Sequence, residues 1–193
     1  MPIPGVIASS ISGHLQTGYF FKIATVTAAG GETSLSFTSI PSTYKHLQIR
    51  GIAQDTYNAV VGSLTPLMQF NGDTGTNYAY HYIWGAPNSG TALTTGGATT
   101  SGINLPKMVP YGLSTSIFGV GIIDIVDYAN TNKNKTVKCI GGVDANITGG
   151  NNNIAPDITS GLWMSTSAIT SITINKAVTS FFAGSTFTLY GVN

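Results

Sequence analysis

Charged side chains are scarce in this 193-residue chain. Only 8% of its residues are Asp, Glu, Lys or Arg, against about 25% in a typical soluble domain. The formal net charge is +1, so there is no excess of positive charge to attract duplex DNA or an anionic membrane surface. We therefore expect neither nucleic acid nor a membrane among the partners of the protein.

Cysteine, helix-favouring residues and long apolar segments are also scarce. The single Cys139 excludes an internal disulfide framework and a zinc cluster built on several cysteines. The longest apolar stretch, Ile117–Val126, is interrupted by Asp124 and is far shorter than the ~20 residues that a membrane-spanning helix needs. Glu and Arg occur once each and apolar residues do not recur at helical spacing, so we expect almost no helix.

What the chain has in quantity is short runs of β-branched and aromatic residues, separated by Gly, Asn, Ser and Pro. About ten such runs with turn signals between them predict an all-β fold, with the strands in an antiparallel sandwich or barrel. The expected strands are Tyr19–Val26, Thr33–Phe37, Tyr44–Ala53, Leu64–Phe70, Tyr78–Trp84, Ser116–Asp127, Thr136–Asp144, Gly161–Ser165, Ile169–Ile174 and Ser185–Gly191.

One expected strand is apolar on both faces. Tyr44–Ala53 alternates between apolar and polar residues, as a strand with one solvated side does, whereas Ser116–Asp127 carries apolar residues on both sides. Such a strand is covered on both sides within its own fold, for example by a long loop such as Asn88–Gly102, or it is covered by a neighbouring subunit. We favour the subunit, because no helix is expected to supply the cover. The candidate oligomer interface is Phe118, Val120, Ile122 and Val126.

The first eighteen residues differ from the rest, since they contain no charged residue, include Pro2 and Pro4 and precede the first convincing strand. We expect residues 1–18 to form an arm that is ordered through contacts with other chains, followed by a single β-sandwich domain over residues 19–193. A frayed terminus or a short edge strand is the competing interpretation. Two Gly-rich segments, Asn88–Gly102 and Ile147–Asp157, are expected to be long loops that form either contact surfaces or disordered tips.

Groups for catalysis or metal binding are few. No G-x-S-x-G motif is present, and no nucleophile motif accompanies the three histidines, which are His14, His46 and His81. Asp127 and Asp144 flank one expected hairpin and are interpreted as hydrogen-bonding groups at strand ends rather than paired acids. The Asn71–Asn77 loop holds one carboxylate, too few for a typical calcium site. We expect no enzymatic activity, no metal and no cofactor.

One expected strand carries an aromatic stripe, formed by Tyr78, Tyr80, Tyr82 and Trp84. An exposed stripe would stack against the sugar rings of a host glycan. A buried stripe would form a ladder in the core or at a subunit interface, which we prefer because aromatic side chains dominate burial in both places. Cys139 alternates with Val137 on an apolar face and is expected to be buried and inert.

The two ends of the chain carry its most distinctive segments. MPIPGVIASSISGHL is followed by FTSIPSTYKHLQIRGIA, and the C-terminal part contains AITSITI and then SFFAGSTFTLYGV. These segments resemble a family of small virion structural proteins of tailed bacteriophages, whereas the middle of the chain, from about Thr56 to Asp157, has no specific match. The resemblance implies a jelly-roll-like β-sandwich that forms a trimer in the virion. It brings no catalytic residue with it.

Composition and resemblance together lead us to expect a bacteriophage virion structural protein without catalysis. The leading hypothesis is a capsid decoration or cement protein, which would stabilise the head shell through oligomer and arm contacts repeated by symmetry. Its expected partners are copies of itself in a homotrimer and other virion proteins, either the major capsid or tail proteins. The alternative is a tail fibre or baseplate-type component that binds host surface glycan.

Overall fold

The structure is a computed structural model that describes residues 19–58, 65–85, 92–110, 112, 114–143, 156–176 and 179–193. The expected arm, residues 1–18, lies outside the described residues, as do most of the expected loop Ile147–Asp157 and the carboxylate of Asp144. The described residues form thirteen strands and no helix, which confirms the all-β prediction. None of them belongs to a helix long and apolar enough to span a membrane.

Eight strands pair as a long hairpin that has been rolled up. The pairs are β1 (Phe20–Thr27) with β13 (Thr186–Val192), β2 (Ser34–Phe37) with β12 (Ile172–Asn175), β3 (His46–Asp55) with β9 (Gly119–Val126), and β4 (Leu67–Phe70) with β7 (Ile103–Asn104). The first strand thus pairs with the last and the pairing proceeds inwards, which is jelly-roll connectivity. The two sheets run β1-β13-β3-β9 and β2-β12-β4-β7, so the expected jelly-roll-like sandwich is confirmed.

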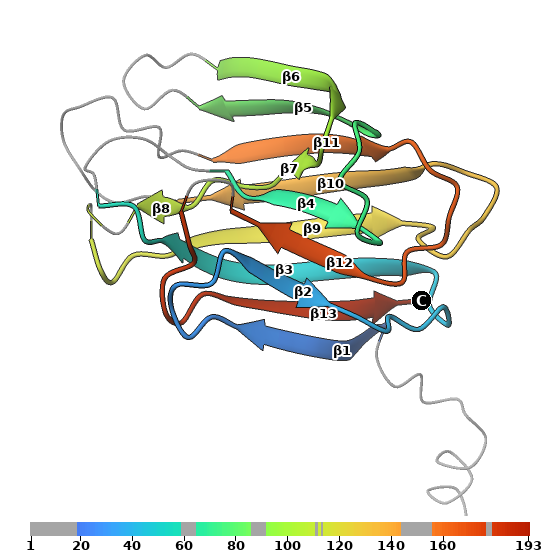
Figure 1. The fold of residues 1–193 in the computed structure, drawn as a ribbon, viewed down its shortest axis with the longest axis horizontal. Helices are drawn as coiled ribbons and strands as arrows, with labels where there is room; N and C mark the ends of the chain where they lie inside the picture. Colours follow the sequence, from blue (N-terminus) through green and yellow to red (C-terminus); the bar gives the residue numbers. More distant parts are fainter. Residues whose placement is uncertain are drawn as a thin grey trace, which may run out of the picture.

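Four more strands widen the first of these sheets. They continue from β9 in the order β10 (Lys135–Gly142), β11 (Asp157–Trp163), β5 (Tyr78–Gly85) and β6 (Ala92–Thr100), and short β8 (Val109–Pro110) pairs with the end of β3. The four-stranded sheet lies against one face of this nine-stranded sheet (Figure 1). We call the covered face of the large sheet its inner face and the opposite one its outer face.

The core lies between the two sheets and follows from the alternation along each strand. The inward-facing side chains at its centre are 0–2% exposed and include Leu47, Ile49, Phe37, Phe70, Ile123, Ile125, Val137, Ile172, Ile174 and Leu189. Cys139 belongs to this core, as expected, and burial raises the pKa of its thiol. The thiolate that would react is therefore disfavoured in the folded protein.

Two glycines open space for a loop on the inner face. Gly121 of β9 and Gly141 of β10 are cross-strand neighbours. A Cβ at Gly141 would overlap Pro106, and one at Gly121 would come within 3.3 Å of the same ring. The segment before β8 therefore lies directly on the sheet, where the backbone N–H of Lys107 donates to Oδ2 of Asp157 at 2.8 Å.

One part of the strand prediction is wrong. Residues 92–100 of the expected loop Asn88–Gly102 form β6, which pairs with β5 at the edge of the large sheet. Both faces of β6 are largely exposed, so burial imposed no apolar alternation that would have marked the strand. Because β6 lies in the sheet, the described part of this segment does not cover the outer face of β9.

Candidate interaction surface

β9 is buried on one side and exposed on the other. Ile123 and Ile125 face the core and are 2% and 0% exposed, whereas Val120, Ile122 and Val126 face outwards and are 53%, 41% and 45% exposed. No described segment covers the outer face at these three side chains. The second apolar face of the strand, which the sequence pattern shows, is therefore open to another molecule.

The exposed side chains of β9 continue as a row across neighbouring strands. In the pairing register Ile122 lies opposite Ile140 of β10, Ile140 opposite Ile158 of β11, and Ile158 opposite Ile83 of β5. These four isoleucines are 41–51% exposed. Since neighbouring strands lie ~4.8 Å apart, the row is ~14 Å long. Single exposed aliphatic side chains are ordinary, but a contiguous group marks an interaction site.

Two more side chains extend the row to β3, where Ile52 lies opposite Val120. We call the six residues the outer-face patch: Ile52, Ile83, Val120, Ile122, Ile140 and Ile158. Shallow hollows open at both ends of the patch, one beside Ile83 and Ile158 and the other beside Ile52 and Val120. Covering six half-exposed aliphatic side chains is worth about 1 kcal/mol each, or about 6 kcal/mol before the cost of association.

Polar groups beside the patch are already paired with one another. Arg50 Nε donates to Gln48 Oε1 at 2.7 Å, and Gln48 Nε2 donates to Asp124 Oδ1 at 2.7 Å. The guanidinium of Arg50 also lies 4.9 Å from the centre of the Phe20 ring and 5.4 Å from that of Tyr190. An apolar centre with a hydrogen-bonded polar rim is the usual anatomy of a protein–protein interface.

The other two predicted interface residues lie away from the patch. Phe118 precedes β9, is half-buried and packs edge-on against Phe182, with the ring centroids 6.4 Å apart. Val126 shares the outer face, but it lies opposite Thr136 at the far end of β9, ~13 Å from Ile122. The structure therefore brings Val120 and Ile122 together and adds four residues that the sequence did not single out.

The aromatic stripe faces inwards. Tyr78 is fully buried, and its hydroxyl accepts the Phe70 N–H at 2.9 Å and donates to the Asp73 carbonyl at 3.0 Å. Its ring stacks on that of Trp163 with the centroids 6.2 Å apart. Tyr80, on the same face, is half-buried and packs against the core. Of the two buried arrangements expected, a ladder in the core or at a subunit interface, this end of the stripe has the first.

The other end of the stripe meets a buried lysine. Tyr82 and Trp84 stack with their ring centroids 4.5 Å apart, and Lys107 Nζ lies 4.6 Å from the centroid of Trp84. Lys107 and Asp157 are 4% and 2% exposed. Burial lowers the pKa of Lys107 and raises the pKa of Asp157. This end of the stripe thus packs within the inner layer.

The buried tyrosines predict a loss of stability at alkaline pH. Burial raises the pKa of Tyr78 and of Tyr82 to about 12, whereas phenols in an unfolded chain ionise near pH ~10. The unfolded chain therefore releases these protons first, so the stabilisation is complete below pH ~10 and is lost as the pH rises towards ~12. Denaturant titrations between pH 9 and pH 12 should show this fall, and Tyr82→Phe should make it shallower. Phenolate absorbance that shows every tyrosine of the folded protein ionised near pH 10 would contradict it.

Both oxygens of the single carboxylate in the Asn71–Asn77 loop accept hydrogen bonds from the protein. Asp73 accepts hydrogen bonds from Trp163 Nε1 at 2.7 Å, from Asn77 Nδ2 at 3.0 Å and from the Gly75 N–H at 2.9 Å. The Trp163 bond is the main reason that the pKa of Asp73 is lowered. This carboxylate orders a turn, and the described residues contain no group of three or more His, Cys, Asp or Glu placed to hold a metal ion.

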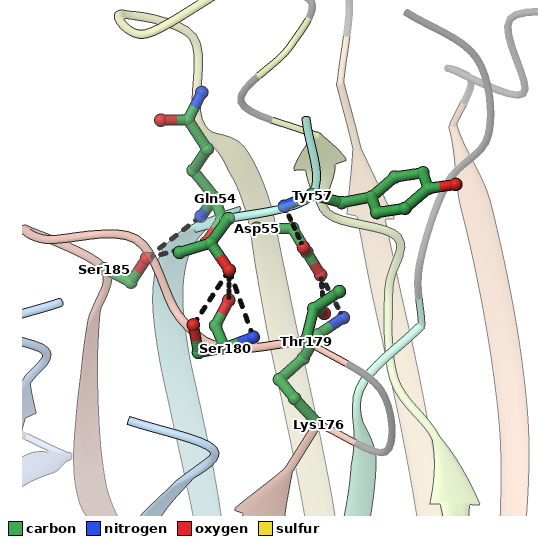
Figure 2. Close-up of polar contacts among 8 residues, drawn as sticks. Gln54, Asp55, Tyr57, Lys176, Thr179, Ser180 and Ser185 are labelled. Carbon is green, nitrogen blue, oxygen red and sulfur yellow. Dashed lines mark hydrogen bonds and ion pairs between the residues drawn. The ribbon is translucent and has the colours of Figure 1, made fainter. Parts of the chain in front are cut away.

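A buried ion pair lies where β3 ends beside the β12–β13 connection (Figure 2). Lys176 Nζ is 2.5 Å from Asp55 Oδ2, and the two side chains are 2% and 0% exposed. The Thr179 hydroxyl donates to the same oxygen at 2.7 Å, and the Tyr57 N–H donates to Oδ1 at 2.7 Å. Burial lowers the pKa of Lys176, and the bond to Asp55 opposes that shift.

Further hydrogen bonds reinforce the same junction. The hydroxyls of Thr56 and Ser180 are 2.8 Å apart, and the Gln54 N–H donates to Ser185 Oγ at 3.0 Å. Apart from the bond between Tyr57 and Asp55, these contacts join the end of β3 to residues that follow β12 (Figure 2). The cluster therefore holds two distant parts of the chain together, and it includes no activated nucleophile.

The candidate catalytic residues are not assembled into a site. His46 Nδ1 accepts the Asp127 N–H at 3.1 Å, and the Asp127 carboxylate pairs with Lys133 Nζ at 2.9 Å. His81 is exposed on β5. Neither described histidine is hydrogen-bonded to a serine or cysteine within the described ranges, and His14 lies outside them.

No protein-family model matches the chain, and a search of curated proteins finds no match to it. The fold and the outer-face patch are therefore the observations on which a function can be proposed. The six side chains of the patch are aliphatic and offer apolar contact.

Proposed function

We propose that the chain is a structural protein of a tailed-bacteriophage particle and that it acts by binding other subunits. The observation that carries the proposal is the outer-face patch, in which six exposed aliphatic side chains lie together on five adjacent strands. The jelly-roll fold is the one that the resemblance of the two chain ends implies, and it supports the same proposal.

Within a particle, the patch would be buried against a neighbouring copy in a homotrimer. Few charges need to be dehydrated when such a surface is covered, and interface centres are depleted in charge for this reason. Symmetry would repeat each contact over the shell, so that modest binding free energies stabilise the whole head. Residues 1–18 would reach neighbouring shell subunits. This is the mechanism of a capsid decoration or cement protein.

The alternative function is a tail component that binds host glycan through the aromatic stripe and the long loops. The stripe faces the inner layer, and Tyr78 and Tyr82 are only 0% and 8% exposed, so the described residues lend this alternative less support. We carry head decoration forward as the proposal.

The number of copies per particle tests the proposal directly. Quantitative mass spectrometry of purified particles should find on the order of hundreds of copies, because shell symmetry repeats every binding site. A density map of the same particles should place the protein on the outside of the head. A few dozen copies or fewer would assign it to the tail, and its absence from particles would overturn the proposal.

A further inference from the structure

β6 forms one edge of the large sheet, and within the described ranges β5 is its one strand partner. Seven of its nine residues are exposed. Thr94 and Thr95 point to opposite faces of the sheet and both are exposed, so neither face of β6 is covered there. The N–H and C=O groups on the far side of β6 are thus directed away from the sheet, where they can template pairing with another strand.

The other three sheet edges carry features that discourage such pairing. β1 has the charged Lys22 and a break in register between Lys22 and Ala24. β2 and β7 are short, with four and two residues. Charges, bulges and short strands are the devices by which proteins protect their edges. β6 has no charge and no proline over Ala92–Thr100, and its register with β5 is regular from Ala92 to Gly97.

We propose that β6 pairs antiparallel with β6 of a second copy of this chain, so that the large sheet continues across a two-fold axis. A second copy fits because an uncharged strand that meets itself brings no like charges together. β6 is also the one long, unprotected edge among the described strands, so it is the edge that a second copy can offer. This contact goes beyond the proposed function, because it joins copies of the chain whatever particle they belong to.

Thr95→Lys tests the pairing. Thr95 is exposed opposite Tyr82, on the face of β6 turned away from the outer-face patch, so a lysine at this position extends into solvent in the single copy but brings a like charge from each copy into the paired edge. Thr136→Lys is the control, because Thr136 is also exposed but lies on β10, which is paired on both sides. Sedimentation velocity should show the mass halved by Thr95→Lys and unchanged by Thr136→Lys.

Hydrogen exchange supplies a readout that a change of side chain alone would not move. Amide protons of residues 92–97 should exchange more slowly in the wild type than in Thr95→Lys, and those of β10 should be unaffected by the same substitution. Equal exchange over residues 92–97 in both proteins, or an unchanged mass, would overturn the pairing.

The variant Ile122→Asp in the outer-face patch separates this contact from the one under the proposed function. If both contacts form in one closed assembly, the wild type is a hexamer, Thr95→Lys is a trimer and Ile122→Asp is a dimer. A wild-type trimer that Thr95→Lys leaves intact overturns the β6 pairing alone. A wild-type dimer that Thr95→Lys dissociates and Ile122→Asp does not supports the β6 pairing and contradicts the patch contact. A monomer at micromolar concentration overturns both.

Discussion

Replacing Asp55 with alanine is expected to lower the free energy of unfolding by about 3–5 kcal/mol, the usual cost of removing one partner of a buried ion pair. The substitution leaves the Lys176 ammonium in the interior without its counter-charge and leaves the Tyr57 N–H and the Thr179 hydroxyl without their acceptor. Because domains of this size are stable by about 5–15 kcal/mol in total, the variant should be close to unfolding at room temperature.

A double-mutant cycle identifies the cause of this loss. Lys176→Met alone removes the other charge, and the double variant Asp55→Ala with Lys176→Met should be more stable than the sum of the two single changes predicts, since no uncompensated charge remains. Lys133→Ala is the surface control, because Lys133 is 63% exposed in its pair with Asp127 and water screens such pairs. Urea unfolding followed by tryptophan fluorescence measures all four variants. An Asp55→Ala protein as stable as Lys133→Ala would show that the pair is not structurally important.

Alternation along the chain was enough to predict most of the fold. In β3, β10 and β13 burial on the inner face imposes a period of two on the apolar residues, so both the strands and their core-facing sides can be read from the sequence. The burial of Cys139 follows from the same period. β6 could not be found in this way, because a strand with both faces exposed imposes no period at all.

The outer-face patch depends on register between strands that are far apart in the sequence. Ile140, Ile158 and Ile83 each lie on the face of their strand that alternation assigns to solvent, and each looks like a single exposed isoleucine. Only the order β9-β10-β11-β5 makes them neighbours. One signal of the patch was present in the sequence, which was that β9 carries apolar residues on both faces. That pattern identified Val120 and Ile122.

The burial of the lysines could not be predicted from the sequence, for a different reason. Lysine is almost always exposed, and a lysine in a polar turn is expected to be solvated. Lys135 is instead fully buried, and its Nζ donates to the carbonyl oxygens of Asn130, Lys133 and Thr166 at 2.6–3.0 Å. Two of these acceptors lie in its own hairpin, but the third comes from a segment after β11, and only the fold brings it there.

Ile122→Asp is expected to weaken self-association at least ~100-fold, which corresponds to ~3 kcal/mol, because an interface would have to bury a carboxylate in place of an apolar side chain. The fold should survive, since Ile122 is 41% exposed on a face that no described segment covers. Sedimentation velocity over a range of concentrations measures the association, and circular dichroism with thermal unfolding measures the fold.

Ile123→Asp is the control for Ile122→Asp that distinguishes a loss of association from a loss of folding. Ile123 is next in the chain, belongs to the same strand and carries the same side chain, but it faces the core and is 2% exposed. Ile123→Asp should therefore unfold the protein, while Ile122→Asp should leave a folded protein with a smaller mass. If Ile122→Asp also unfolds the chain, a segment of the same molecule covers the patch. If it leaves both the mass and the fold unchanged, the six aliphatic side chains of the outer face are not a contact between copies.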